Sequence, residues 1–141
     1  ATSLSVNVTL ASGNYHVRVE NPDGNAGRST NNILTASTAP SFTTNAGSLG
    51  TFAGNFSGNI ATIAGSSDSA VTFSEVGSNL TGANVTLSSA GVLATTDFGG
   101  SSTTATLYTF TLRATDAEGQ TADRVFTLQS SFGATGGGQF N

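Results

Sequence analysis

Apolar and polar residues alternate along the first part of the chain. The segment SLSVNVTL carries apolar side chains at every second position, which are Leu4, Val6, Val8 and Leu10. The segment NYHVRVEN repeats the alternation with Tyr15, Val17 and Val19. A period of two is typical of half-buried β-strands. We therefore predict two strands, over residues 4–10 and 15–20, that pair through the link between them.

A turn and a third strand complete this segment. In the sequence NPDG, Pro22 suits the first central position of a turn and Gly24 suits a position with positive φ. The chain should then return as a strand over residues 29–36. Three strands cannot cover both faces of a sandwich, and so we expect the apolar face to be buried by another chain or by residues upstream. The candidate interaction residues on this face are Leu4, Val6 and Val8.

Pro40 separates this segment from a longer one. Proline favours an extended joint and cannot continue a ladder. Six runs beyond it, divided by glycine-rich links, are predicted to be strands: residues 60–64, 71–76, 85–88, 91–95, 106–115 and 121–129. Short strands at this spacing predict a β-sandwich over residues 40–129. The segment GSLGTFAGNFSGN fits either a flexible link or an edge strand with bulges.

The first segment resembles a known immunoglobulin-like module. The stretch GNYHVRVENPDGNAGRSTNNILTAS is similar to the closing half of an IPT/TIG domain, in which a Tyr-x-Val-x-Val strand and an Asn-Pro-Asp-Gly turn precede a short strand. The resemblance implies a partial IPT/TIG-like β segment over residues 1–39. The front half of that domain is then expected upstream or in another subunit.

The second segment resembles a different immunoglobulin-like repeat. The stretches LSSAGVLATT and YTFTLRATDAEGQTADRVFTL are similar to the closing half of an Ig, cadherin-like repeat of bacterial surface proteins and of structural proteins of marine tailed phages. With an IPT/TIG piece just upstream, the chain resembles the tandem arrays of cyanophage virion proteins. The implied fold class is all-β: an immunoglobulin-like antiparallel β-sandwich preceded by a partial immunoglobulin-like segment.

Composition limits the chemistry that the chain supports. Charged residues make up 9% of the sequence, against roughly 25% in typical globular domains. Cys is absent, which excludes thiol catalysis, disulfide bonds and cysteine metal sites. A net charge of −4 gives no positive surface for a nucleic acid, and no apolar run is long enough for a transmembrane helix. We expect neither nucleic acid nor membrane as a partner.

The stretch YTFTLRATDAEGQTADRVFTLQ concentrates charge around one short loop. Asp116, Glu118 and Asp123 could offer hard oxygen ligands, which makes them the candidates for a calcium site. A calcium ion takes roughly six to eight oxygens, however, and no EF-hand spacing is present. Asp and Gly are ordinary turn residues, and so we predict a solvated hairpin that places Arg113 near Asp123. No catalytic residue and no cofactor is expected.

The last residues, SSFGATGGGQFN, differ in kind because three consecutive glycines exclude a regular element. Phe132 and Phe140 follow the last expected strand, where no core is left to bury them. Two interpretations of residues 130–141 stand. They are a disordered end, or an anchoring peptide whose rings dock on a neighbouring subunit. Phe132 and Phe140 therefore join the candidate interaction residues.

These observations favour a non-enzymatic structural protein. The resemblance to phage repeats implies a surface-decoration or fibre module of a virion, oligomeric in its assembly, that acts as a spacer and a weak adhesive surface. Its partners would be other virion or surface-protein subunits, with a host surface as a further option. The alternative is a binding module of a secreted or surface-bound bacterial adhesin or glycan-active protein. The absence of Trp disfavours glycan recognition.

Overall fold

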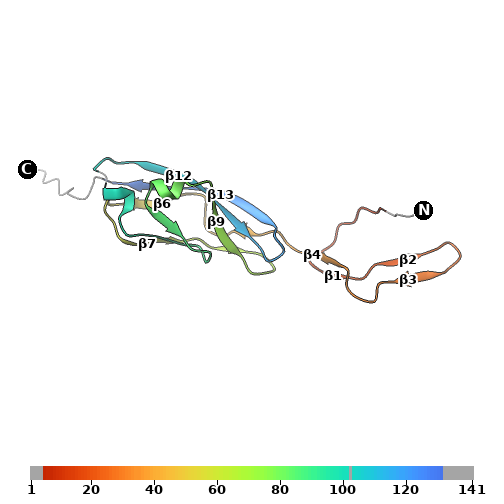
Figure 1. Ribbon diagram of the computed structural model, residues 1–141. Coiled ribbons are helices and arrows are strands. Elements are labelled where there is room, and N and C mark those ends of the chain that lie inside the picture. The colour runs from red at the N-terminus through yellow and green to blue at the C-terminus, as the bar shows by residue number, and fades with distance from the viewer. Residues whose placement is uncertain (1–4, 102, 132–141) are drawn as a thin grey trace, which may run out of the picture. The chain divides into compact units, whose positions relative to one another are not determined.

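The computed structural model of the chain describes residues 5–101 and 103–131. Contacts between Cα atoms divide the chain into two compact units: unit 1 is Ala1–Thr38 and unit 2 is Ala39–Asn141. The regular elements in the described part of both units are mainly strands (Figure 1). The all-β class predicted from the sequence is therefore confirmed.

Unit 1 contains four short strands that form two antiparallel pairs. They are β1 (Gly13–Tyr15), β2 (Arg18–Glu20), β3 (Ala26–Arg28) and β4 (Leu34–Ala36). β1 pairs with β4, and β2 pairs with β3. The predicted NPDG turn joins β2 to β3 and is confirmed: Gly24 has a φ of 90°, and its amide donates to the carbonyl of Asn21 at 2.9 Å. A carboxylate oxygen of Asp23 accepts from the amide of Asn25 at 3.0 Å.

The strand predicted over residues 4–10 is wrong in the part that the structure describes. Residues 5–10 belong to no ladder, and Leu4 lies outside the described residues. The segment that was expected to pair with them pairs elsewhere, since β1 and β2 both bond to return strands. The physical reason is turn chemistry: Pro22 and Gly24 suit their positions in the turn after β2, which favours the pairing of β2 with β3.

The return strand predicted over residues 29–36 is also corrected. Only its last three residues form a strand, which is β4, whereas β3 ends at Arg28, before the predicted strand begins. Between them the amide of Ser29 donates to the carbonyl of Val17 at 2.8 Å, so the two short pairs remain connected.

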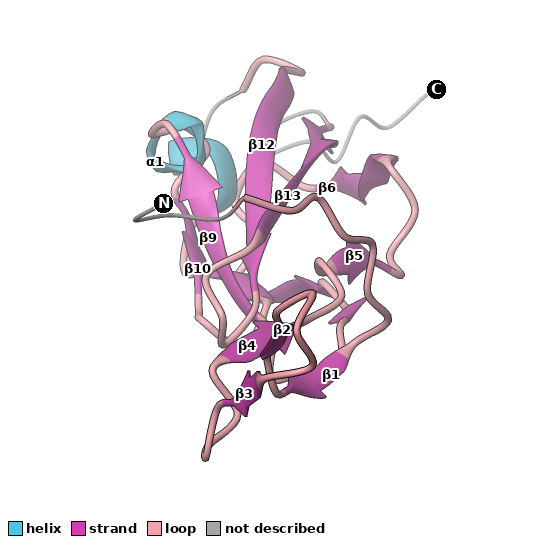
Figure 2. Ribbon diagram, turned by 90° about the vertical axis from the view of Figure 1, so that its right-hand side faces the viewer, coloured by secondary structure: helices cyan, strands magenta, loops and turns pink. Residues whose placement is uncertain are grey.

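Unit 2 is an immunoglobulin-like β-sandwich. Its strands are β5 (Ser41–Phe42), β6 (Gly47–Phe52), β7 (Gly58–Thr62), β8 (Gly65–Ser66), β9 (Thr72–Val76), β10 (Val85–Leu87), β11 (Val92–Thr95), β12 (Leu107–Thr115) and β13 (Thr121–Ser130). One sheet has the order β6-β13-β12-β9 and the other the order β10-β11-β7, while β5 pairs with β8. Neighbours are antiparallel except β6 and β13, which are parallel. The short helix α1 (Asn79–Gly82) contacts β12 and β10, and Figure 2 shows it in cyan.

The six strands predicted for unit 2 are confirmed as β7 and β9 to β13, with bounds that shift by at most two residues. The glycine-rich segment before β7 contains β6, a strand at the edge of its sheet. The register between β13 and β6 shifts between Thr127 and Gln129. Of the two interpretations of this segment, the edge strand with an irregular register is therefore correct.

Phenylalanine rings fill much of the core of unit 2. In one group, Phe42 lies 5.7 Å from both Phe73 and Phe126, measured between ring centroids. Phe126 in turn stacks on Phe110 at 6.2 Å. In the other group, Phe52 lies 5.0 Å from Phe56 and 6.1 Å from Phe98, and Phe98 lies 5.6 Å from Tyr108. Aliphatic side chains that include Ile63, Val85 and Leu93 complete the core.

Arg124 fixes β5 to the rest of the sandwich. Its Nη1 donates to the carbonyl of Thr44 at 2.6 Å and to the carbonyl of Phe42 at 3.1 Å. Its guanidinium carbon also lies 5.4 Å from the centre of the Phe42 ring. A guanidinium can bond to carbonyls and cover a ring at the same time because it is planar. β5, only two residues long, is thus held by a side chain of β13.

The facing of β12 leads to a first prediction. Phe110 is 1% exposed, while its neighbour Thr111 is half-buried on the opposite face, as the alternation in the sequence predicts. Phe110→Ala should lower the free energy of unfolding by about 3–5 kcal/mol, because it removes a ring from a close-packed core. Thr111→Ala should have little effect. Chemical denaturation of both variants measures this, and equal losses would contradict the assigned facing.

The turn between β10 and β11 leads to a second prediction. Gly91 has a φ of 88°, and a Cβ atom there would lie 2.3 Å from the carbonyl oxygen of Ile63. Gly119 has a similar φ of 85°, but a Cβ atom there would meet nothing within 4 Å. Gly119→Ala should therefore cost only the backbone strain of about 1–2 kcal/mol, whereas Gly91→Ala should cost about 2–5 kcal/mol because overpacking is added. Thermal unfolding of both variants tests the difference. Similar melting temperatures would contradict the prediction, because they would show that the backbone shifts to make room for the added Cβ atom at Gly91.

Candidate functional site

The charged loop singled out in the sequence is a tight hairpin turn between β12 and β13. The Asp116 side chain is 5% exposed and folds back on the loop. Its Oδ1 accepts from the amide of Glu118 at 3.1 Å and from the amide of Gln120 at 2.7 Å, and its Oδ2 accepts from Nε2 of Gln120 at 3.1 Å. Gly119 supplies the positive φ. Asp116 therefore acts as the internal cap of the turn.

The other two calcium candidates also have protein partners. Glu118 accepts a hydrogen bond from the hydroxyl of Ser69, and that hydroxyl accepts from the amide of Ala117 at 3.1 Å. Asp123 accepts from Nε and Nη2 of Arg113 at 2.7 and 2.8 Å, in the cross-strand register predicted from the sequence. This hydrogen bonding, with the attraction between the charges, raises the pKa of Arg113 and lowers the pKa of Asp123.

The three carboxylates thus accept hydrogen bonds from three different sets of protein donors. Within residues 5–101 and 103–131, no three His, Cys, Asp or Glu side chains gather in a way that could hold a metal ion. The structure describes a turn with a charge pair, which is the arrangement that the sequence favours. Calcium binding by Asp116, Glu118 and Asp123 would compete with these hydrogen bonds.

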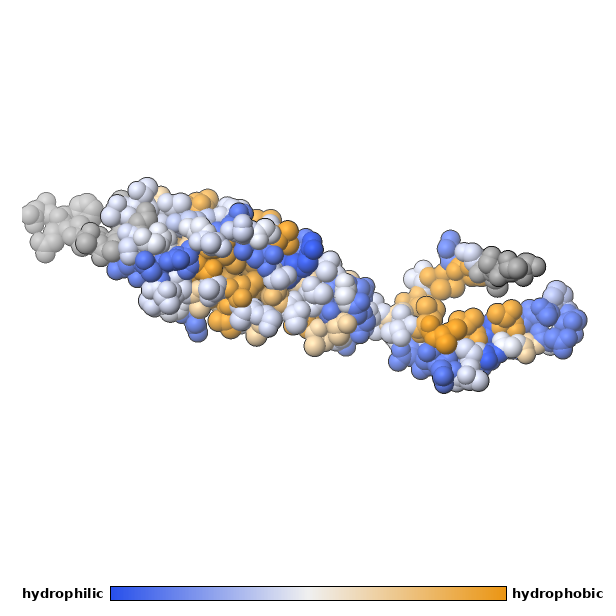
Figure 3. Space-filling view, in the orientation of Figure 1, coloured by the Kyte–Doolittle hydropathy of each residue, from blue (hydrophilic) through white to orange (hydrophobic). Residues whose placement is uncertain are grey.

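Unit 1 presents an apolar surface, which we call the unit 1 face. A hollow of about 430 Å³ opens on it, and its apolar lining consists of Val6, Val8, Leu10, Tyr15, Val17, Val19 and Leu34. Val6 and Val8 are 67% and 62% exposed, and Val17, Val19 and Leu34 are also exposed. Figure 3 shows hydrophobic residues in orange at the surface of unit 1, on both sides of a gap. Two of the predicted interaction residues therefore lie on this face, while Leu4, Phe132 and Phe140 lie outside the described residues.

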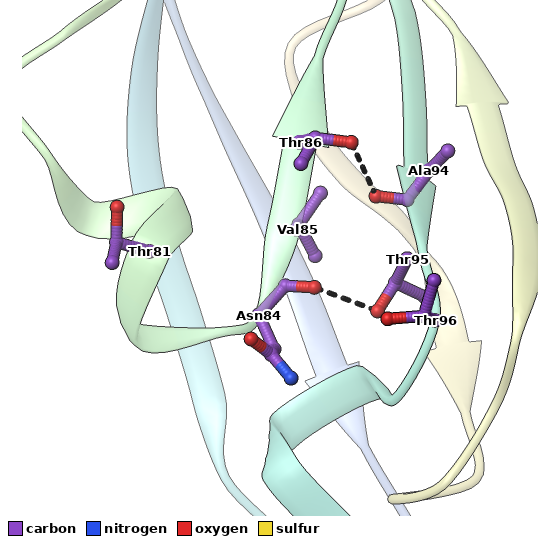
Figure 4. A pocket seen from close by; sticks show the side chains of 7 residues that line it. All are labelled: Thr81, Asn84, Val85, Thr86, Ala94, Thr95 and Thr96. Atoms are coloured by element: carbon purple, nitrogen blue, oxygen red, sulfur yellow. Dashed lines mark hydrogen bonds between the residues drawn. The ribbon is translucent and has the colours of Figure 1, made fainter.

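A second hollow, of about 300 Å³, lies on unit 2 between α1, β10 and β11 (Figure 4). Polar side chains line much of it, but several are engaged within the protein. The hydroxyl of Thr95 donates to the carbonyl of Asn84 at 2.7 Å, and that of Thr86 donates to the carbonyl of Ala94 at 3.1 Å. Nδ2 of Asn84 donates to the carbonyl of Asp97 at 3.0 Å. These groups hold β10 and β11 together at the margin of the hollow.

Comparison with solved structures identifies the fold. The chain is similar to PcdhgB3 EC1-4, with a TM-score of 0.55 and 15% identity over 82% of this chain and 38% of that one. It is also similar to the protocadherin gamma B7 extracellular cadherin domains 1–4, with a TM-score of 0.54 and 11% identity over 87% of this chain and 40% of that one. The chain thus spans less than half the length of these structures.

This likeness shows a cadherin-like, immunoglobulin-type β fold. Neither the family models nor the curated proteins give a match to the sequence. The helices in the described part of the chain are all too short or too polar to cross a membrane.

The hydrogen bonds of these three carboxylates lead to a third prediction. Addition of EDTA should leave the melting temperature unchanged, because a bound calcium ion would otherwise stabilise the folded state. Asp116→Ala should instead lower the free energy of unfolding by about 1.5–3 kcal/mol, since it removes hydrogen bonds to a charged group. Calcium should not alter that loss. A melting temperature that falls by several degrees with EDTA and recovers with calcium would contradict this description of the hairpin.

Proposed function

We propose that the chain is a non-enzymatic structural module of a surface assembly, in which unit 2 is a rigid spacer and unit 1 makes contact with a neighbouring subunit. The observation that carries this proposal is the unit 1 face. Val6 and Val8 are both more than half exposed beside an apolar hollow. An exposed apolar patch rimmed by polar residues is typical of a protein–protein contact.

The charge distribution supports the same division of roles. Unit 1 contains two Arg and two acidic residues, so its formal net charge is zero, and unit 2 carries the whole charge of −4. A neutral apolar face can approach another subunit without long-range repulsion. The acidic residues of unit 2 help to keep it soluble as a spacer.

The non-enzymatic character is supported by the chemistry of the hairpin. Asp116, Glu118 and Asp123 are the densest group of carboxylates in the sequence, and each serves a structural hydrogen bond. A general acid or base must be free to bond to a reacting group. One of the similar structures is described as extracellular cadherin domains, which accords with an adhesive or structural role.

Within this class we place the chain on a virion surface, as a decoration or fibre module, with other virion subunits as partners. The support for this placement is the resemblance of the sequence to the tandem repeats of phage structural proteins. The second candidate is a module of a secreted or cell-surface bacterial adhesin. The similarity to structures described as extracellular cadherin domains favours this candidate.

Fractionation of the source material tests the placement. An antiserum against the 141-residue chain, combined with peptide mass spectrometry, should detect this sequence in purified virus particles in a constant ratio to a capsid protein. An abundant soluble host protein serves as the control for carry-over. Detection in the secreted or cell-wall fraction alone would overturn the virion placement and support the adhesin module. Detection only as a free protein inside cells would contradict both.

A further inference from the structure

On one side of unit 2, the outermost strands of both sheets have no further ladder partner among residues 5–101 and 103–131. β6 ends the four-stranded sheet and β7 ends the three-stranded sheet. The two edges lie on the same side, because the chain passes from β5, which pairs with β8 just after β7, directly into β6. The ring contact between Phe52 at the end of β6 and Phe56 just before β7 also joins the two edges. We call this side of unit 2 the open seam.

The open seam lacks charged side chains, although the register of β6 against β13 is irregular. Proteins commonly place charged side chains on an edge strand to prevent another strand from pairing with it. The sequence has no Asp, Glu, Lys or Arg between Ser29 and Ser67, which includes all of β6 and β7. At the opposite edge, by contrast, β9 carries Glu75. Apolar side chains, Leu49, Phe52 and Ile60, are half-buried along the seam.

The backbone of β6 has hydrogen-bonding capacity on its free side. A strand bonded to one neighbour directs alternate amides and carbonyls away from it. The amide of Gly50 donates to the hydroxyl of Ser48, in the same strand, at 3.2 Å. This amide is therefore satisfied locally, and an incoming strand could replace the hydroxyl with a carbonyl.

Residues 5–10 have the complementary features. They lie in no ladder of the described structure, and they match the six-residue length of β6. Val6 and Val8 are exposed at alternate positions, with polar Asn7 between them. No Asp, Glu, Lys or Arg occurs before Arg18. The segment thus has the apolar alternation of a strand and lacks a ladder partner.

We propose that residues 5–10 of one copy of the chain add as a strand to the free edge of β6 in a second copy, with Val6 and Val8 against the open seam. Strand addition of this kind gains affinity from main-chain hydrogen bonds and specificity from the alternate side chains. The proposal rests on the proposed function, because it names the subunit that the unit 1 face contacts. Since the contact joins two different surfaces, it repeats from copy to copy and produces either a ring or an open series of subunits.

Charge favours a second copy as the occupant. Unit 2 holds six of the eight acidic residues and two of the four Arg, so copies of it repel one another over most of their surface. The open seam and residues 5–10 are both uncharged. Long-range repulsion between two copies therefore does not oppose contact between these two uncharged surfaces.

Cysteine pairing tests the contact directly, because the chain contains no Cys of its own. Asn7→Cys lies on the solvent side of the proposed strand, and Ser48→Cys lies at an exposed position on β6. The two single variants of the 141-residue chain, mixed and oxidised, should form a disulfide-linked dimer that reduction separates. The matched control mixes Asn7→Cys with Ser74→Cys, an exposed position on the opposite edge strand β9. Equal linkage in both mixtures would overturn the proposal.

A charge substitution provides the second measurement. Val8→Asp places a carboxylate against the seam, and Asn7→Asp places the same charge on the solvent side. In light scattering over a concentration series, Val8→Asp should weaken self-association by about tenfold or more, because the carboxylate loses its hydration. Asn7→Asp should change it much less. An unmodified chain that stays monomeric at about millimolar concentration, the range of weak contacts, would overturn the proposal.

The outcomes separate this inference from the proposed function. If the chain is found in particles but Asn7→Cys and Ser48→Cys do not link, the strand addition is wrong and the structural role stands. If Asn7→Cys links mainly to itself, two unit 1 faces meet each other and the open seam is not the partner. If the specific link forms but the chain is absent from particles, strand addition stands and the virion placement fails.

Discussion

Contact between aromatic rings is the interaction on which the second unit depends. The sequence contains no Cys and no Met or Trp, so neither disulfide bonds nor the most adaptable apolar side chains are present to fill the core. The rings of Phe42, Phe73, Phe110 and Phe126 instead form a connected group. These rings come from β5, β9, β12 and β13, which means that strands distant in sequence are joined by one packed cluster. Rings bring large buried areas and preferred geometries to such a cluster.

The entry of the chain into the sandwich depends on this cluster. β5 contributes little ladder of its own, since only Ser41 and Phe42 pair with β8. Its position is set by the Phe42 ring in the core and by Arg124, which bonds to the carbonyls of Phe42 and Thr44. The chain then crosses to the other sheet as β6. β5 pairs with β8 and not with β6, so within the described residues β6 has β13 as its one ladder partner.

The sequence predicts the parts of this structure that have a regular period. Phe110, Leu112 and Ala114 alternate with polar residues, and all three are buried as the alternation requires. The pairing of Arg113 with Asp123 follows from a symmetrical hairpin around a short turn. The calcium candidates were identified by residue type alone, and residue type cannot show that Asp116 is turned inward to bond with Gln120.

Other parts have no signal in the sequence. β5 and β8 are two residues each, too short to show a period, and the contact of Arg124 with Phe42 joins positions 82 residues apart. The strand prediction for residues 5–10 is wrong for the opposite reason. Their alternation is clear, but a strand also needs a neighbouring strand with which it can form a ladder. The alternation of apolar residues shows which side chains can be buried together. Whether they are buried depends on the presence of a neighbouring strand or surface. Val6 and Val8 illustrate this difference, since they have the pattern of a strand and remain exposed.

The parallel pairing of β6 with β13 determines how unit 2 responds to mechanical load. The chain enters β6 at Gly47, beside Phe126, and leaves β13 at Ser130, beside Phe52. Tension between these two points pulls the strands lengthwise past each other, so the load is shared by all the hydrogen bonds of the ladder. A hairpin pulled from its open end would instead lose its bonds one at a time. A unit with this geometry resists extension when the chain is pulled between Gly47 and Ser130.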